Sequence, residues 1–350
     1  MQGNGAYNST AVVQMTLVDY TRELLKNNIH RLRPSSPNTI RIADLGASEG
    51  RNSMALLATV LELLQEFLPA SQSREFIVYH EDLPANDFNS LLNTINSTLS
   101  YLHNRPNVYA SVISKSFYER LVPAESLDVV VSFISLHWLS SIPAPVPGNN
   151  MTMSQVTRDA YPGIYKLWKD KAHEDLVKFL RLRAIELSDH GVMCLTMAGY
   201  TNSIVHNAWV SVIPRALQQL VTMGLLSQTS LDKMTIGGYI RTCDEIKLAA
   251  AQVPELVLHE CKDIDMPLLV GSAQNAAAFM VATTTPSIVD VMTKEEVENS
   301  SFHTTFAVKL EEEFSRLITV DGVTKPIYAC LECRYIYCAF TRQPRLAARF

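Results

Sequence analysis

The distribution of apolar residues predicts five β-strands that alternate with helices. Runs of apolar or β-branched residues occupy 39–45, 74–80, 107–113, 126–133 and 191–198, and such runs are typical of buried strands. Helical periodicity fills the intervals between them. Because strands that alternate with helices form parallel sheets, we expect an α/β fold with a doubly wound, mostly parallel, Rossmann-like sheet.

The second half of the chain departs from this alternation. A proline-rich turn at 142–148 and a methionine-containing loop precede an amphipathic helix over about 164–187, and so long a connection predicts a lid. Later helical patterns predict a cap over the carboxyl ends of the strands, where open α/β sheets bind ligands. The expected organisation is a single unit with an N-terminal segment (1–36), an α/β core (37–142 and 188–200), a lid loop with the long helix (143–187), a helical cap (201–255 and 270–325) and final core strands (256–265 and 333–342).

A glycine-rich turn follows the first predicted strand. Asp44 ends the strand, and Gly46 and Gly50 allow the backbone to turn sharply and to approach a ligand closely. A helix begins at about Asn52 and directs its positive N-terminus toward the same place. This pattern predicts a site for a nucleotide-type cofactor.

The spacing of acidic residues distinguishes two classes of cofactor. A dinucleotide site requires a third glycine and an acidic residue about 20 positions downstream, but the third glycine is absent. The next acid at a strand end is Asp82, which is 82 − 44 = 38 positions after Asp44. Glu62 and Glu66 lie nearer, but within an apolar helical pattern in which they should face solvent. S-adenosyl-L-methionine (SAM), which has no pyrophosphate, therefore fits better than NAD, although an NAD-dependent oxidoreductase stays as an alternative.

Composition excludes several functional classes. The 350 residues are 47% hydrophobic and 19% charged, with a net charge of −5, which disfavours both disorder and a nucleic-acid partner. The N-terminal residues show no basic segment followed by an apolar one, and no stretch of 18 apolar residues occurs. We therefore expect a soluble cytoplasmic protein without a membrane partner.

Six cysteines are too few and too scattered for a disulfide framework. Cys330 and Cys333 form half of a common zinc ligand set, and Cys338 lies close behind. No second cysteine or histidine pair follows, and residues 334–340 have the pattern of an ordinary buried strand. A structural role is thus favoured for these cysteines.

Further motifs follow the later strands in order. They are residues 82–89 (Asp-Leu-Pro-Ala-Asn-Asp-Phe-Asn), 116–118 (Ser-Phe-Tyr) and 135–140 (Ser-Leu-His-Trp-Leu-Ser). Together with the turn at 44–52 and with Tyr7 and Gln14, this series resembles the SABATH family, the SAM-dependent carboxyl and N-methyltransferases of the salicylic acid, benzoic acid and theobromine type. The resemblance runs nearly end to end and includes residues 175–187. It implies a SAM-dependent carboxyl methyltransferase, and, because members of the family often dimerise, a homodimer.

The resemblance also implies roles for individual residues. Asp82 would accept hydrogen bonds from the ribose hydroxyls, since a carboxylate can take two protons at once. Gln14 and Trp138 would tether the substrate carboxylate, with His137 beside them, and these three are the implied catalytic residues. The implied cofactor-binding residues are Tyr7, Gln14, Asp44, Gly46, Ala47, Asn52, Asp82, Leu83, Ser116, Phe117, Ser132 and Phe133. The expected substrate-binding residues are Gln14, Ile134, His137, Trp138, Met151, Met153, Trp209 and Tyr239.

The chain departs from the family pattern at several positions. Ala11 stands where a serine is usual, which removes one hydrogen bond to the cofactor. Residues 232–235 read Asp-Lys-Met-Thr in place of the Asp-Ser-Phe-Asn segment that helps some members to bind magnesium, so we expect no functional metal. Residues 281–286 differ as well. These departures suggest a divergent branch, whose substrate need not be a known plant hormone.

The expected chemistry requires few catalytic groups. A carboxylic acid with a pKa near ~4 is already ionised at pH 7 and needs no general base, so positioning and exclusion of water are the main tasks. The alternative is an N- or phenol O-methyltransferase, in which His137 would act as the base because a neutral nucleophile must lose a proton. A SAM-binding regulatory protein without turnover is a rival of another class.

Overall fold

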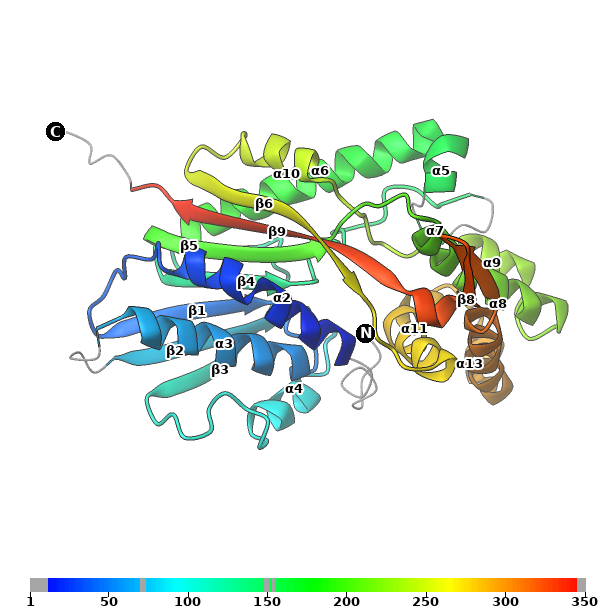
Figure 1. Ribbon diagram of the computed structural model, residues 1–350, viewed down its shortest axis with the longest axis horizontal. Helices are drawn as coiled ribbons and strands as arrows, with labels where there is room; N and C mark the ends of the chain where they lie inside the picture. The colour runs from blue at the N-terminus through cyan, green and yellow to red at the C-terminus, as the bar shows by residue number, and fades with distance from the viewer. Residues whose placement is uncertain (1–11, 70–73, 148–150, 153–154, 345–350) are drawn as a thin grey trace.

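The central feature of the protein is a seven-stranded sheet with strand order β3-β2-β1-β4-β5-β9-β6 (Figure 1). The computed structural model describes residues 12–69, 74–147, 151–152 and 155–344. The strands of this sheet are β1 (Thr39–Leu45), β2 (Glu75–Asp82), β3 (Val108–Ser114), β4 (Leu127–Phe133), β5 (Leu187–Ala198), β6 (Leu256–Pro267) and β9 (Glu332–Arg342).

The pairing of these strands confirms the predicted fold class. Strands β1 to β5 pair in parallel, whereas β9 is antiparallel to both β5 and β6. The predicted strand positions agree with the structure to within a few residues, except that β5 begins at Leu187 rather than near 191. Leu187 is fully buried and pairs with Leu127 of β4, so tertiary contacts recruit a segment whose Ser-Asp-His-Gly sequence resembles a turn.

Alternating side chains of the strands build a separate apolar layer on each face of the sheet. In β4, Val129 and Val131 pack on the face covered by α2, α3 and α4, while Val130 packs on the face covered by α6 and α10 (Figure 1). Glu62 and Glu66 lie on the outer side of α3, as expected. The bounds of these helices are Val12–Ile29 (α2), Arg51–Phe67 (α3), Phe88–Ile95 (α4), Pro162–Glu186 (α6) and Cys243–Ala250 (α10).

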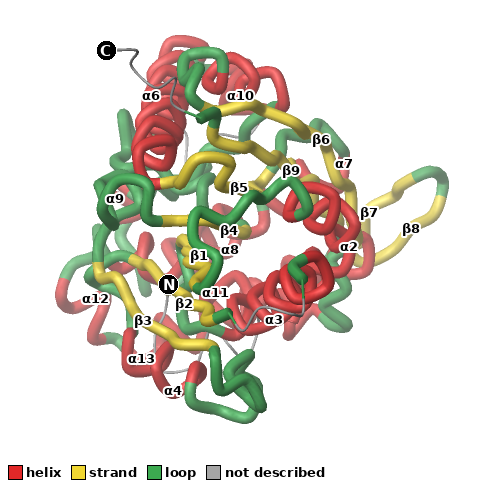
Figure 2. Tube along the Cα trace, turned by 90° about the vertical axis from the view of Figure 1, so that its left-hand side faces the viewer, coloured by secondary structure: helices red, strands yellow, loops and turns green. Residues whose placement is uncertain are grey.

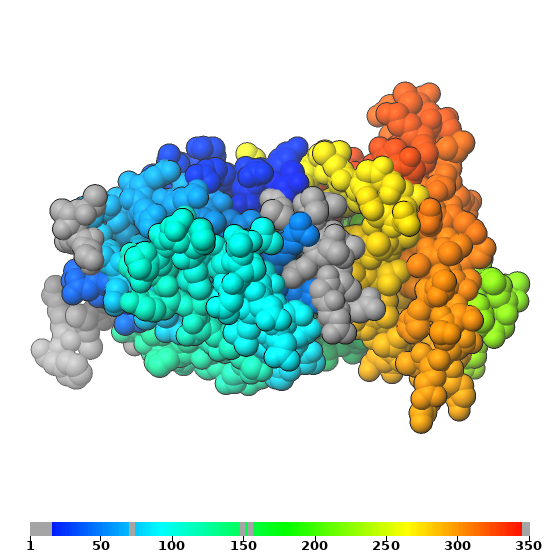
Figure 3. Space-filling model, turned by 90° about the horizontal axis from the view of Figure 1, so that it is seen from below, coloured from blue at the N-terminus to red at the C-terminus, as the bar shows by residue number. Residues whose placement is uncertain are grey.

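A second group of helices packs around its own apolar core beside the carboxyl ends of the strands. Figures 1 and 3 show this cap, coloured from green to orange, next to the blue and cyan α/β core. Its helices are α7 (Ile204–Val210), α8 (Val212–Thr222), α9 (Gln228–Lys233), α11 (Ala273–Val289), α12 (Lys294–Glu298) and α13 (Ser300–Phe314), while the short α5 (Gln155–Ala160) precedes α6 and a 3₁₀ turn, η1 (Ile327–Cys330), precedes β9.

One element of the cap region was not predicted. Strands β7 (Leu317–Val320) and β8 (Val323–Pro326) form a two-stranded hairpin that projects from the molecule (Figure 2). Its apolar residues Leu317 and Val323 are exposed, and each strand is only four residues long, so the sequence gives little sign of it. Within the described part of the chain, no helix is long and apolar enough to cross a membrane.

Candidate active site

The turn after β1 has the conformation that its glycines predict. Gly46 has φ +86° and Gly50 has φ +96°, values that side chains rarely tolerate. A Cβ atom at Gly46 would also lie 2.2 Å from Oγ of Ser135, so no other residue fits there. The backbone N–H of Gly46 donates to the carbonyl and the side chain of Glu81, which joins the turn to the end of β2.

A small polar pocket lies at this turn and beside the N-terminus of α3. The predicted residues that line it are Asp44, Gly46, Ala47, Asn52, Phe133 and Ile134. Ser53 holds the carboxylate of Asp44 by a short hydrogen bond, and the same hydroxyl lies 3.0 Å from Nδ1 of His80. An acid facing the N-terminus of a helix suits a ligand that carries both an ammonium and a carboxylate group, as the methionine portion of SAM does.

Asp82 is the last residue of β2, the strand that pairs with β1 in the sheet. Its carboxylate accepts hydrogen bonds from the backbone N–H groups of Ser48 at 2.7 Å and Leu83 at 2.8 Å. Burial raises the pKa of Asp82, and these two N–H groups oppose that rise. Two backbone bonds leave the carboxylate with lone pairs for two hydroxyls, so the geometry suits the predicted contact with a ribose, and the exposed Leu83 lies beside it.

Ser116 and Phe117 lie in the loop after β3, which is adjacent to β2 in the sheet. Helix α6 fixes this loop through a fully buried ion pair, Arg183–Glu186, with an N–O distance of 2.7 Å. Arg183 donates to the carbonyls of Phe117 and Glu119, each at 2.9 Å, and Glu186 accepts from the N–H of Leu121. The motif on α6 therefore positions a loop that is expected to contact adenine.

Ile134 joins the cofactor pocket to a second cavity, because it lines both. It is held at φ +59° by bonds from its N–H to the carbonyl and hydroxyl of Thr196. For a β-branched residue this is a strained conformation, and such strain is concentrated at functional sites. Ser132, by contrast, is fully buried and its hydroxyl donates to the carbonyl of Leu45 within the sheet, and its contact with the cofactor stays a prediction.

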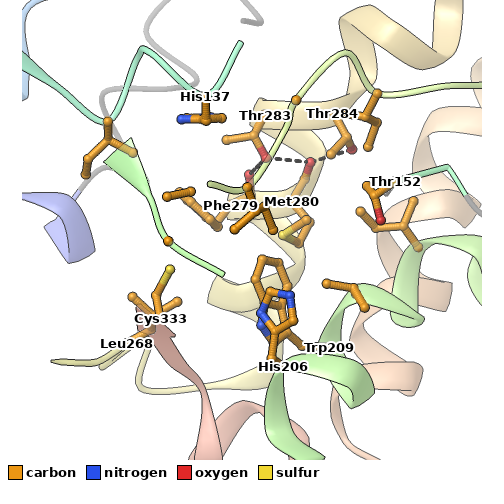
Figure 4. A pocket seen from close by; sticks show the side chains of 18 of the residues that line it. His137, Thr152, His206, Trp209, Leu268, Phe279, Met280, Thr283, Thr284 and Cys333 are labelled. Carbon is orange, nitrogen blue, oxygen red and sulfur yellow. Dashed lines mark hydrogen bonds between the residues drawn. The ribbon is translucent and has the colours of Figure 1, made fainter. Parts of the chain in front are cut away.

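The second cavity has a volume of about 210 Å³ and lies between the carboxyl ends of β4 and β5 and the cap (Figure 4). Aliphatic and aromatic side chains form most of its wall. Four of the predicted substrate-binding residues line it, namely Ile134, His137, Trp138 and Trp209. The cavity is therefore suited to an apolar ligand that enters next to the cofactor pocket.

Contacts from Arg241 and from α6 fix the turn that carries His137 and Trp138. Arg241 is buried and donates to the carbonyl of Leu136 at 2.6 Å, and Asp175 of α6 accepts from the N–H and the hydroxyl of Ser140, both at 2.8 Å. Burial, with the nearby charge of Arg241, lowers the pKa of His137 to about 4. His137 is therefore neutral at pH 7, and its conjugate acid is too strong for it to be an effective base.

Two of the predicted substrate-binding residues lie elsewhere. Met151 is buried in the core of the cap, and Tyr239 packs against Tyr165 and donates to Glu245 at 2.8 Å. Neither lines the cavity, because a methionine or an aromatic residue near a site packs equally well in a neighbouring core, and their contact with a substrate stays a prediction. Tyr7 and Met153 lie outside the described residues, as does the side chain of Gln14.

The sequence-based prediction missed much of the wall that the cap contributes. The residues missed are His206, Ile213, Ile236, Leu268, Phe279 and Met280. His206 and Trp209 are three positions apart on α7, so they share one face of that helix. That spacing was a usable signal, whereas the inward faces of α8 and α11 could not be distinguished from ordinary core faces.

The described residues contain no group of three or more histidine, cysteine, aspartate or glutamate side chains placed to hold a metal ion. Cys333 and Cys338 lie on β9, where Cys338 is fully buried. This agrees with the buried strand predicted over 334–340. That the protein functions without a metal stays a prediction.

Comparison with known proteins connects this geometry to a family. A family model described as SAM dependent carboxyl methyltransferase matches residues 1–327. The S-adenosyl-L-methionine:benzoic acid/salicylic acid carboxyl methyltransferase 3 of Petunia hybrida is 29% identical over 258 residues, which cover 70% of this chain and 72% of the relative. The 7-methylxanthine methyltransferase 1 of Coffea canephora is 29% identical over 70% of this chain and 68% of its own length. A solved structure of loganic acid methyltransferase with SAH superimposes with a TM-score of 0.80 at 18% identity over 99% of both chains, which shows a common fold.

Proposed function

This chain belongs to the family of SAM-dependent carboxyl methyltransferases, the SABATH family, and we propose that it transfers a methyl group to the carboxylate of a small hydrophobic acid. It is an enzyme whose methyl donor is SAM. One observation supports the proposed reaction most directly. A polar pocket at the β1 turn and an apolar cavity under the cap share Ile134 as a common wall, so a donor in the first would lie beside an acceptor in the second.

The residues of the pocket at the β1 turn and the neighbouring end of β2 fit the cofactor. Asp44 and the N-terminus of α3, which lie at the pocket, would face the methionine portion, and Asp82, which ends β2 next to β1, would hold the ribose hydroxyls. SAM supplies the methyl group on a positively charged sulphur. The chain's own contribution is to orient that group toward Ile134.

The apolar cavity would place the acid and exclude water. Trp138 lines it and carries an indole N–H that can only donate, so it suits a carboxylate. An ionised acid needs no base. Attack of the anionic carboxylate on the cationic donor removes both charges, and water stabilises the charged reactants more than the reacting pair. An apolar wall that excludes water therefore favours the reaction. Gln14 is expected to tether the same carboxylate from the N-terminal segment.

The alternative reaction, N- or phenol O-methylation, is favoured by the similarity to a 7-methylxanthine methyltransferase. It would require a base to remove a proton from the neutral acceptor. His137 is the histidine nearest Trp138, but burial and Arg241 lower its pKa to about 4, which makes it a poor partner for a phenol or an amide N–H. Carboxyl methylation is therefore the better-supported reaction.

Transfer of a deuterated methyl group tests the proposal. The purified protein would be incubated with methyl-deuterated SAM and a panel of aromatic and aliphatic acids, phenols and xanthines, and the products measured by mass spectrometry. We expect labelled methyl esters from one or more acids. A protein that binds SAM but forms an ester from none of the acids would refute the proposed function, and labelled N-methylxanthines or methyl ethers of the phenols would establish the alternative.

A further inference from the structure

Helix α7 presents two unpaired polar atoms to the apolar cavity. Nδ1 of His206 and Nε1 of Trp209 are both buried, and neither has a hydrogen-bond partner among the described residues. The two side chains line the cavity, and their rings meet edge to face with centroids 5.6 Å apart. Figure 4 shows both side chains rising from the same helix toward the space enclosed by α11.

Three other polar side chains of this wall already have partners. Thr283 donates to the carbonyl of Phe279 at 2.9 Å, and Thr284 donates to the carbonyl of Met280 at 2.7 Å, as Figure 4 shows by dashed lines. The thiol of Cys333 lies 3.7 Å from the carbonyl of Arg334. Among the described residues of the wall, the buried side-chain nitrogens without a partner are therefore those of His206 and Trp209 on the cap side and Nδ1 of His137 on the sheet side.

Burying a polar atom without a hydrogen-bond partner is unfavourable. Two such atoms side by side therefore indicate that a ligand supplies the missing hydrogen bonds. The indole N–H of Trp209 can only donate. His206 is 4% exposed, and burial, together with the charge of Arg158, lowers its pKa to about 4. Its ring is thus neutral, with one nitrogen a donor and the other an acceptor.

A hydroxyl group matches this pair better than other polar groups do. The hydroxyl oxygen can accept a hydrogen bond from Trp209 while the hydroxyl hydrogen is donated to Nδ1 of His206. If Nδ1 of His206 carries the proton instead, the hydroxyl oxygen can accept from both side chains. A carboxylate has no proton to donate, so it would serve only the tautomer in which Nδ1 of His206 carries the hydrogen, and moving its charge from water to an apolar wall costs free energy. A hydroxyl is therefore the group that this corner selects.

The pair lies opposite the residues that are expected to hold the carboxylate. His137 and Trp138 follow β4 on the sheet side, whereas His206 and Trp209 belong to the cap, and Figure 4 places His137 across the cavity from the α7 pair. We propose that His206 and Trp209 form a second subsite, which binds a hydroxyl group at the end of the substrate remote from its carboxylate. The preferred substrates would then be hydroxylated hydrophobic acids, an inference that rests on the proposed carboxyl methylation.

Matched pairs of acids test this subsite. Suitable pairs are benzoate with para-hydroxybenzoate, phenylacetate with para-hydroxyphenylacetate, cinnamate with para-hydroxycinnamate, and a straight-chain fatty acid with its terminally hydroxylated form. Initial rates of methyl transfer give kcat/KM for each acid, and calorimetry in the presence of S-adenosylhomocysteine gives its binding without turnover. For a skeleton that spans the cavity, we expect the hydroxylated acid to be favoured by about 10-fold or more, since an analogue that lacks the group leaves buried donors unpaired.

Two variants of α7 test whether the preference for hydroxylated acids arises from His206 and Trp209. Trp209→Phe keeps most of the ring but removes the donor, and should lower the preference about 5- to 10-fold, mainly through the hydroxylated acid; His206→Phe should act in the same direction. Phe279→Leu is the matched control, because it alters the same wall without removing a hydrogen-bonding atom, and should leave the ratio within each pair unchanged. Thermal unfolding of each variant shows that it is folded.

The outcomes separate the subsite from the proposed function. Methylation of the parent acids with equal or higher efficiency than the hydroxylated ones, or a preference unchanged in both α7 variants, would overturn the subsite alone. Calorimetric preference for a hydroxylated ligand that is lost in Trp209→Phe, without any ester formed, would support the subsite and refute the carboxyl methylation. Failure of every acid both to bind and to react would overturn both.

Discussion

Replacing Arg183 by methionine should destabilise the protein and weaken its hold on SAM. The Arg183–Glu186 pair is fully buried, with a 2.7 Å N–O distance. Methionine would leave the fully buried carboxylate of Glu186 with the partly exposed Arg120, 3.3 Å away, as its remaining cationic partner, and would remove the donors to the carbonyls of Phe117 and Glu119. Removing one member of a buried pair costs about 3–5 kcal/mol, so we expect a loss of that size in the free energy of unfolding.

The substitution should also weaken SAM binding, because Arg183 holds the loop that carries Ser116 and Phe117. In folded Arg183→Met protein, we expect the KM for SAM to rise about 10-fold, a change of about 1.4 kcal/mol, while the KM for the acid stays within about 2-fold.

Chemical denaturation monitored by circular dichroism, and initial-rate kinetics, measure the two effects. Arg181→Met is the matched control, because Arg181 is exposed on the same helix and should change stability by less than about 0.5 kcal/mol. Adding Glu186→Gln to Arg183→Met should recover part of the loss, since the buried side chain at 186 then carries no charge. If Arg183→Met costs no more than Arg181→Met, or if the loss in SAM affinity is equalled by a loss in acid affinity, the positioning role is refuted.

Three further predictions concern the site and its acids. Trp138→Phe removes one donor and should lower kcat/KM for the acid about 10- to 100-fold, with SAM binding by calorimetry almost unchanged; an equal loss of SAM affinity would contradict the assignment. Because the pKa of His137 is lowered to about 4 and the acid is ionised above ~4, the rate of ester formation should be flat between about pH 6 and 8, whereas an inflexion near 6.5 that disappears in His137→Phe would indicate a base. Burial, with the charge of Asp82, raises the pKa of Glu81 to about 9 from an ordinary 4.5. The folded protein therefore keeps a proton that the unfolded chain releases, and stability should fall as the pH rises from about 4.5 to about 9. Glu81→Gln should flatten that fall and raise the free energy of unfolding at pH 8 by about 2–5 kcal/mol, and an unchanged pH dependence would exclude this role for Glu81.

The sequence predicted the sheet well because its strands are buried on both faces. Runs such as that of β4, in which every residue from Leu127 to Ser132 is buried, need only local apolarity to be recognised. The β7–β8 hairpin was not predicted, since each strand has only four residues and apolar residues such as Leu317 and Val323 are exposed. The extra turn of β5 depends on pairing of Leu187 with β4, a contact distant in sequence that no local pattern contains.

The residues of the functional site were likewise predicted only in part. Glycine at 46 and the acids at 44 and 82 were found because backbone geometry and strand ends restrict the residue types that can occupy them. The walls of the cavity were found only in part, because Met151 and Tyr239 are chemically as suited to a pocket as to the core in which they lie. His206 was missed although it lies three residues before Trp209, a spacing that places both side chains on one face of a helix. The homodimer and the cytoplasmic location stay predictions.

A crystal structure with S-adenosylhomocysteine and an acid bound would test the central claim most directly. The claim is that the donor occupies the pocket at the β1 turn and that the acid meets it across Ile134. We expect both ribose hydroxyls to lie within hydrogen-bond distance of the Asp82 carboxylate, and the acid's carboxylate to contact the indole nitrogen of Trp138. A sugar bound away from Asp82, or an acid whose carboxylate points away from the donor's sulphur, would contradict it.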